Sequence, residues 1–386
     1  MPASVDERYR AALALAYICH SGGNSILRLL KTMSPEDIWA APQSRLTMDE
    51  SVSEAAAQRF VRSRRGQEWR EAESGLKAAG LRFVPFGTSA YPQELTNLSH
   101  PPVGLFVKGD EEKLEALLTL PRITIVGTRR ATAYGTQAAR DFAAAFAARG
   151  IAVVSGMALG VDGRSHEAAL EMRGLTAAVL GCGADIVYPR RHRGLYQRIV
   201  ERGLAMSELP PGAPPAPWTF PNRNRLLAAL GDAVVVVEGS PISGAMQTAD
   251  QGASLGRPVF AVPGSIYVEN HRGCNLLLRD GAVPALDPDM TVEEFLLQTR
   301  IERGERRPPE REAGAALPGS GQDPFRELVA AGREAILEAI AERPHSVDAL
   351  VVRTGMTARH LTAALAELEL GGLAARAGPG LYIRAP

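Results

Sequence analysis

The residues of this sequence best suited to bind a ligand lie in one short stretch, WTFPNRNR, where Trp218 and Phe220 are followed closely by Arg223 and Arg225. Aromatic rings stack on nucleobases and guanidinium groups attract phosphates, so this combination suits single-stranded nucleic acid; metal binding and covalent catalysis do not need it. Phe220 is the better candidate for stacking. Trp218 follows a run of prolines and is expected to pack the loop down. Burial of both rings in a core is the alternative.

The two arginines of this stretch are expected to act differently. A helix capped by Asn222 places Arg223 and Arg225 two residues apart, about 200° around the axis, so both cannot face one ligand. Arg223 lies nearer the helix start and is the expected phosphate contact. Asn224 or Arg225 is then expected to tie the loop to the sheet.

Two glycine-containing loops could complete such a site. The first, GTRRATAYG, carries Arg129 and Arg130, and the helix expected to begin near Gly135 would offer free N–H groups to an anion. Thr128 and Arg129 stand where the GxGxxG of a dinucleotide fold needs glycines, so no nicotinamide cofactor is expected. The second loop, SGMALGVDG, contains three glycines, so its amides could approach a phosphate closely.

The sequence does not predict metal binding or covalent catalysis. Asp162 and His166 have the i, i+4 spacing of two metal ligands on a helix, but no third ligand is apparent, so we expect Asp162 to cap the helix and His166 to hydrogen-bond within the fold. Cys182 has no histidine placed beside it and is expected to be a packing residue. The three cysteines show no CxxC spacing. We therefore expect no metal, no cofactor and no catalytic residue.

These candidates follow short apolar runs that alternate with helical stretches. The runs are ITIVG, IAVVSG, TAAVLG, AVVVVEG and PVFAVPG, beginning at Ile123. Continuous apolar runs with helices between them predict a parallel sheet that is buried on both faces. In such sheets ligands bind at the carboxyl ends of the strands, which is where the glycine loops and arginines lie.

Composition limits the alternatives. The chain has 386 residues, 45% of them hydrophobic, which predicts two or three domains, each with its own core. The formal net charge is zero, which argues against a protein that coats nucleic acid through bulk charge, so a nucleic-acid site must be a local patch. We expect no membrane span and no signal peptide, and the cysteine usage suits a reducing cytoplasm.

Several motifs in a fixed order give a family resemblance over about residues 120–285. With GTRRATAYG, SGMALGVDGRSHEAAL, FPNRNRLLAAL, SGAMQTAD and PVFAVPG, the sequence resembles the DNA-processing DprA (Smf) family. The resemblance implies a protein that binds and protects single-stranded DNA, dimerises through a Rossmann-like domain and loads the RecA recombinase in natural transformation and recombination. Together with Arg130 from the first turn, the implied DNA pocket uses Arg129, Ser155, Gly156, Phe220, Arg223, Asn224, Arg225, Ser243 and Gly244.

The sequence departs from the family pattern in two places. Relatives often carry a basic residue shortly before the aromatic, whereas residues 214–217 here read PPAP. In the N-terminal part, CHSGGN at Cys19 to Asn24 replaces the PGIG hairpin common in relatives. DNA binding by a helix-hairpin-helix element is therefore not expected here.

The expected architecture is α/β with flanking modules. Residues 1–110 form a SAM-like helical module with an extended connector, 111–298 a Rossmann-like domain that binds single-stranded DNA, 299–322 a flexible linker and 323–386 a winged helix. The last segment holds seven basic and eight acidic residues. A major-groove reader needs a positive face, so DNA is expected at the Rossmann-like domain instead.

Two alternatives come from other classes. A Rossmann-like hydrolase that releases the base from nucleotides would need a GGxGTxxE stretch, and the matching region offers Thr248 and Asp250 without the glycines. A transcription regulator would use the winged helix on duplex DNA, which the acidic residues Glu367 and Glu369 of its third helix disfavour.

Overall fold

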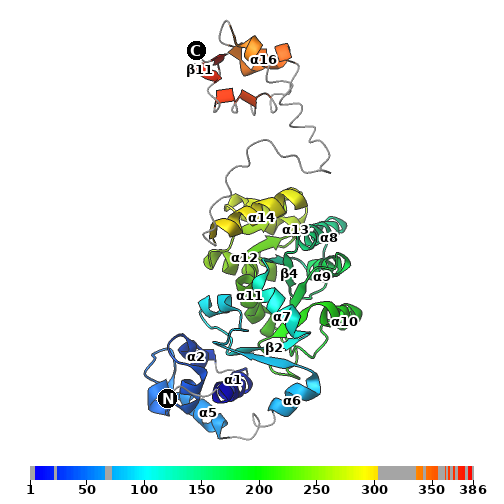
Figure 1. The fold of residues 1–386 in the computed structure, drawn as a ribbon. Helices are drawn as coiled ribbons and strands as arrows, with labels where there is room; N and C mark the ends of the chain where they lie inside the picture. The colour runs from blue at the N-terminus through cyan, green and yellow to red at the C-terminus, as the bar shows by residue number, and fades with distance from the viewer. Residues whose placement is uncertain are drawn as a thin grey trace. The chain divides into compact units, whose positions relative to one another are not determined.

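The computed structural model describes residues 5–20, 24–65 and 72–302 and, in the C-terminal part, residues 336–341, 345–354, 361, 364–365, 368–369, 373–378 and 381–384. The chain divides into two compact units, Met1–Arg307 and Pro308–Pro386. Figure 1 shows helices and strands in both units.

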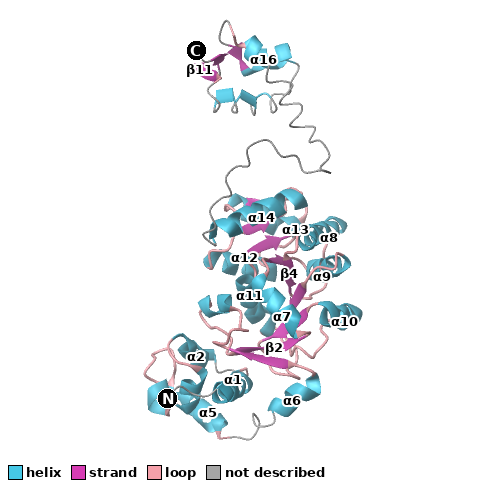
Figure 2. Cartoon of the chain, in the orientation of Figure 1, coloured by secondary structure: helices cyan, strands magenta, loops and turns pink. Residues whose placement is uncertain are grey.

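A nine-stranded sheet forms the centre of the first unit, with the strand order β1-β2-β6-β5-β4-β3-β7-β8-β9 (Figure 2). In this spatial order, β6 and all the strands after it run parallel to one another. At the other edge, β1 pairs antiparallel with β2, and β2 pairs antiparallel with β6. This mostly parallel sheet confirms the predicted α/β fold. The strands are β1 (Arg82–Pro85), β2 (Gly104–Lys108), β3 (Arg122–Val126), β4 (Ala152–Ser155), β5 (Thr176–Val179), β6 (Leu204–Ser207), β7 (Ala233–Val236), β8 (Val259–Ala261) and β9 (Val283–Pro284).

Helices cover both faces of the sheet, which is why its central strands are continuous apolar runs. In Figure 1, α11 and α12 lie on one side of β4, and α8, α9 and α10 lie on the other. Apolar side chains of α14 join the core on the α8 side, and those of α7 and α13 join the α11 side. The helices are α7 (Glu111–Thr119), α8 (Ala133–Ala148), α9 (Val161–Glu171), α10 (Arg193–Arg202), α11 (Thr219–Leu230), α12 (Gly244–Ser254), α13 (Glu269–Arg279) and α14 (Pro288–Glu302).

Strand β3 marks the point where the order of strands reverses. The chain adds β4 on one side of β3 and later adds β7 on the other side. The loops that leave β3 and β7 therefore diverge to opposite faces and leave a crevice between them, where ligands bind in open α/β sheets.

A helical module precedes the sheet and packs against its antiparallel edge. Phe83 of β1 and Phe106 of β2 belong to the same apolar core as the module's helices. Ser34 caps α3, since its Oγ accepts the amide of Asp37 at 3.2 Å. The helices are α1 (Val5–Cys19), α2 (Asn24–Leu27), α3 (Pro35–Ala40), α4 (Gln43–Leu46), α5 (Glu54–Arg64) and α6 (Ala72–Ala79).

The second unit has its own small core and sheet. Strands β10 (His345–Ser346), β12 (Leu381–Arg384) and β11 (Ala374–Gly378) pair antiparallel in that order, and helix α16 (Val347–Thr354) packs beside them. The hairpin predicted for the winged helix is present. Residues 299–302 of the predicted linker continue α14, and 303–322 lie outside the described residues.

The domain boundaries at 110 and 298 stay predictions. No described helix is both long and apolar enough to cross a bilayer.

Candidate nucleic-acid interface

A cavity of about 690 Å³ opens at the carboxyl edge of the sheet, beside β3. The loop after β3, the first turn of α11 and the start of α12 contribute to its walls. It lies at the edge where the sequence predicted a ligand. Of the predicted site residues, its lining includes Arg129, Arg130, Phe220, Arg223, Asn224, Ser243 and Gly244.

Phe220 projects from the first turn of α11 between two other side chains. The Cζ of Arg129 lies 5.2 Å from the centroid of the Phe220 ring, and the ring of Tyr188 lies 5.4 Å from it at an angle of 37°. Arg129 is exposed and Phe220 is half-buried. A guanidinium over an aromatic face is attracted by the ring quadrupole, so the two side chains support one another in a single wall.

Arg223 is placed differently from what the sequence predicted. It is only 5% exposed, and its Nη1 donates to the carbonyl oxygen of Gly156 at 2.8 Å and also to that of Val179. Burial lowers the pKa of Arg223, and the negative charge of Asp162 acts in the opposite direction and raises it. The guanidinium thus joins the ends of β4 and β5 to α11. Contact between Arg223 and a phosphate stays a prediction.

The glycine loop after β4 is held by these buried charges. A Cβ on Gly156 would lie 2.5 Å from the Arg223 guanidinium, so the close approach requires glycine. Asp162 was expected to cap the next helix, and this is wrong. Gly160, at φ 79°, occupies the N-cap position, and the Oδ2 of Asp162 accepts the amide of Ala158 at 3.3 Å. Burial raises the pKa of Asp162, and Arg223 opposes that shift.

Two polar residues near this loop are internal. Ser155 is fully buried and its Oγ donates to the carbonyl oxygen of Ile125 at 2.6 Å, so its side chain ties β4 to β3. Neither Ser155 nor Gly156 lines the cavity. His166 hydrogen-bonds within the fold as predicted, with its Nδ1 2.7 Å from the Oγ1 of Thr176. Burial lowers the pKa of His166 to about 3, so the imidazole is neutral.

The start of α12 faces the cavity with its first-turn amides. Ser243 is its N-cap residue, and the Ser243 Oγ has no hydrogen-bond partner among the residues that the structure describes. The Nδ2 of Asn224 donates to the carbonyl oxygen of Gly244 at 3.3 Å, which ties α11 to α12. Unpaired amides at a helix start bind anions, so this turn can hold a phosphate.

Arg225 and Trp218 point away from this cavity. Arg225 forms an ion pair with Glu208, and Arg223 and Arg225 therefore face different sides, as their spacing predicted.

Trp218 does not pack the loop down, because it is 53% exposed. The helix begins at Thr219, with Trp218 at the cap position, rather than at Asn222. It starts early because Pro221 is compatible with a first helical turn, where its missing N–H is not needed.

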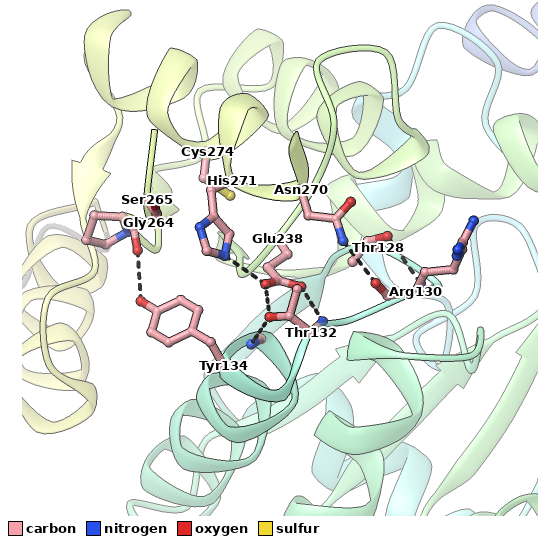
Figure 3. Close-up of polar contacts among 12 residues, drawn as sticks. Thr128, Arg130, Thr132, Tyr134, Glu238, Gly264, Ser265, Asn270, His271 and Cys274 are labelled. Carbon is pink, nitrogen blue, oxygen red and sulfur yellow. Dashed lines mark hydrogen bonds and ion pairs between the residues drawn. The ribbon is translucent and has the colours of Figure 1, made fainter. Parts of the chain in front are cut away.

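The anion expected at the start of α8 is supplied by the chain itself. Glu238 is fully buried, its Oε2 accepts the amide of Thr132 at 3.0 Å, and its Oε1 lies 2.9 Å from the Nε2 of His271 (Figure 3). The Oγ1 of Thr132 donates to Glu238 at 2.5 Å and accepts the amide of Gly135. The amides of Thr132 and Gly135 are thus satisfied internally, and binding of an external anion at this helix start stays a prediction.

Sequence reasoning missed Tyr188 and Glu238. Tyr188 follows the third apolar run, and an aromatic residue after a strand at the ligand-binding edge is a usable signal. Glu238 is a single carboxylate at the end of an otherwise apolar run, AVVVVEG, and a buried charge must find partners. Its partner Thr132 lies 106 residues away in the chain, which the sequence alone does not reveal.

Comparison with known families decides the identity of the fold. A family model described as DNA recombination-mediator protein A matches residues 82–296, and one described as the DprA winged helix domain matches residues 315–380. The chain belongs to the DprA family. The first match contains the whole cavity, and the second confirms the predicted winged helix.

Individual DprA relatives agree. The chain is 40% identical over 303 residues to the DprA relative of Mycobacterium tuberculosis, covering 78% of this chain and 70% of the relative. It is 32% identical over 357 residues to protein Smf of Escherichia coli, covering 90% and 89%.

Among solved structures, DprA of Streptococcus pneumoniae matches with a TM-score of 0.63 at 28% identity, covering 76% of this chain and 99% of that one. DprA of Helicobacter pylori, whose structure is described for its single-stranded DNA binding mode, matches with a TM-score of 0.51 at 30% identity, covering 57% and 98%.

Proposed function

We propose that this chain binds single-stranded DNA in the cavity at the carboxyl edge of its sheet. The observation that carries the proposal is the exposed Arg129 guanidinium over the Phe220 ring, because it combines a stacking surface with a positive charge in one wall. Neither a hydrogen bond nor an ion pair holds the Arg129 guanidinium among the described residues, so its donors are available to a phosphate. The single-stranded DNA bound by the Helicobacter pylori relative supports the same assignment.

The expected contacts have distinct roles. Phe220 stacks on a base, Arg129 and Arg130 pair with phosphates, and the Ser243 hydroxyl and the first amides of α12, from Gly244 onward, supply neutral donors. Arg223 and Asn224 hold the glycine loop and α12 in position, respectively. Ser155 ties β4 to β3, Gly156 accepts from Arg223, and Arg225 pairs with Glu208 on the other side of α11, so these three act on the fold around the cavity.

The proposed biological role is that of a recombination mediator. The chain protects incoming or exposed single strands and loads a RecA-type recombinase in natural transformation and recombination, acting as a homodimer through the sheet domain. Exposed apolar side chains near α14, at Leu286, Met290 and Leu297, support this dimer surface. Pairing two cavities across a dimer raises avidity through effective concentration.

Catalysis is not part of the proposal. Asp162 is the one carboxyl group among the described residues that line the cavity, and it is buried and bonded to a loop amide. Glu238 is enclosed by Thr132 and His271. The Rossmann-like hydrolases considered as an alternative need a carboxylate that reaches the substrate, so incubation with nucleoside monophosphates should release no free base.

The test is binding of fluorescein-labelled oligothymidine, measured by anisotropy over a range of salt concentrations. Wild type should bind with an affinity that falls as salt rises, and Arg129→Ala should weaken binding and lower the slope by about one. Arg149→Ala is the matched control, because it removes the same charge from an exposed site paired with Glu293 at the far end of α8. Equal affinity of wild type and Arg129→Ala, or preference for duplex, would overturn the proposal.

A further inference from the structure

A second hollow lies on the opposite side of the first turn of α11. It has a volume of about 130 Å³, and it is formed between this turn, the end of β6 and the helical module with its connector. It is distinct from the cavity described above, although both are lined by Arg223. Its lining includes Trp218, Asn222, Arg223, Arg225, His20 and His100.

Trp218 gives this hollow an aromatic surface. The indole is 53% exposed, and no aromatic ring of the described part of the chain packs against it. Trp218 lies two positions before Phe220, so the two rings leave the same turn in different directions. Phe220 lines only the large cavity, and Trp218 lines only the hollow.

The hollow also contains buried donors without acceptors. Arg28 Nε donates to His100 Nε2 at 3.1 Å, so the neutral imidazole carries its proton on Nδ1. That Nδ1 is buried and no described residue accepts from it; the same holds for the Nη1 of Arg225. Buried donors usually have acceptors, and two that lack them at one hollow indicate a ligand with acceptor oxygens.

A pyrimidine base satisfies both features, since it offers a flat face to Trp218 and carbonyl oxygens to the two donors. A strand with one base on Phe220 needs only to cross the first turn of α11 to bring another base to Trp218. We propose that this hollow is a second base-binding subsite for the same single strand, with Trp218 as its stacking surface and the helical module as one of its walls. The inference rests on the proposed function and extends the path of the strand beyond the large cavity.

The test compares oligothymidines of two lengths, about 2 and about 20 nucleotides, because two nucleotides are too short to pass around the first turn of α11 and only the longer strand can fill both sites. Trp218→Ala should weaken binding of the longer strand by about 5- to 150-fold, the range for one stacked base, and leave the shorter strand unchanged. Trp218→Phe should retain most of the affinity, because stacking survives. His100→Ala should cause a smaller loss, again with the longer strand only. Phe220→Ala should weaken both strands.

The outcomes separate the two proposals. If Trp218→Ala loses the same affinity for both strands, Trp218 only supports the large cavity. If it loses affinity for neither strand, the exposed indole serves a protein partner. Each of these results overturns the proposed subsite. If Phe220→Ala still weakens both strands in those cases, the proposed function stands. If wild type binds neither strand, both proposals fail. The thermal melting temperature of each variant checks that the fold is intact.

Discussion

The guanidinium of Arg129 lies over the ring of Phe220, 5.2 Å from its centroid, although 91 positions separate the two residues in the sequence. The contact joins the loop after β3 to the first turn of α11, and so closes one wall of the crevice at the switch point of the sheet. Because each side chain fixes the position of the other, their contributions to binding should depend on one another.

A double-mutant cycle tests that dependence. Phe220→Ala should weaken binding of oligothymidine by about 1–3 kcal/mol, the value of one stacked base. Arg129→Ala should weaken it less, and the double variant should lose less than the sum of both, with a coupling of at least about 0.5 kcal/mol. The measurement is anisotropy at one salt concentration. Additive losses would mean that the two residues bind the strand independently.

Arg223 should matter mainly for stability. Arg223→Ala removes donors from the carbonyl groups of Gly156 and Val179 and takes from Asp162 the stronger of its two neighbouring cations, so we expect the free energy of unfolding to fall by about 2–5 kcal/mol. Urea denaturation measures it. Arg129→Ala is the comparison, and its exposed site should change stability by less than about 0.5 kcal/mol. Similar stabilities for both variants would contradict the buried role.

The stability should depend on pH through His166. Burial lowers its pKa to about 3, with His192 and Arg223 adding to the shift, whereas the unfolded chain binds this proton near pH 6.5. Between these values only the unfolded state takes up the proton, so this contribution is complete above about pH 6.5 and is lost as pH falls toward 3.

Replacement of His166 should expose this contribution. His166→Gln should reduce the slope of unfolding free energy against pH, between about pH 5 and 6.5, by up to about 1.4 kcal/mol per pH unit. Urea titrations at a series of pH values measure the slope. An unchanged slope would mean that His166 takes up its proton in the folded protein as well.

The proposed dimer surface can be tested by placing charge on it. Met290→Arg introduces a cation beside the exposed Leu286 and Leu297, and should raise the dimer dissociation constant at least about tenfold. Sedimentation equilibrium measures it. Met48→Arg, at an exposed apolar residue of the helical module, is the control and should leave association unchanged. Equal association of both variants with wild type would place the dimer contact elsewhere.

The sequence predicted the elements of the fold well, because each follows from a local pattern. The five apolar runs ending in glycine became β3, β4, β5, β7 and β8, and the segment AARAGPGLYI became the hairpin of β11 and β12. The edge of the sheet that holds the cavity also followed from this pattern, since parallel strands place their carboxyl ends together.

The placement of side chains could not be predicted in the same way. The role of Arg223 depends on the carbonyl group of Gly156, 67 positions earlier, and the helix start at Thr132 is filled by Glu238, 106 positions later. Such pairings are set by which strands become neighbours. The prediction that Trp218 packs the loop down was wrong for a local reason. The first helical turn begins at Thr219 and directs the Trp218 ring outward, not onto the proline run.

The carboxylate of Glu238 at the start of α8 has a consequence for which groups can bind an anion beside β3. In doubly wound folds this helix start, after the first parallel strand, is where the pyrophosphate of a nucleotide cofactor binds. Here an acidic side chain of the protein occupies that position and repels a second anion. The positive groups beside β3, Arg129 and Arg130, therefore face the cavity without an anion-binding helix start next to them, and a phosphate there depends on these side chains and on the start of α12.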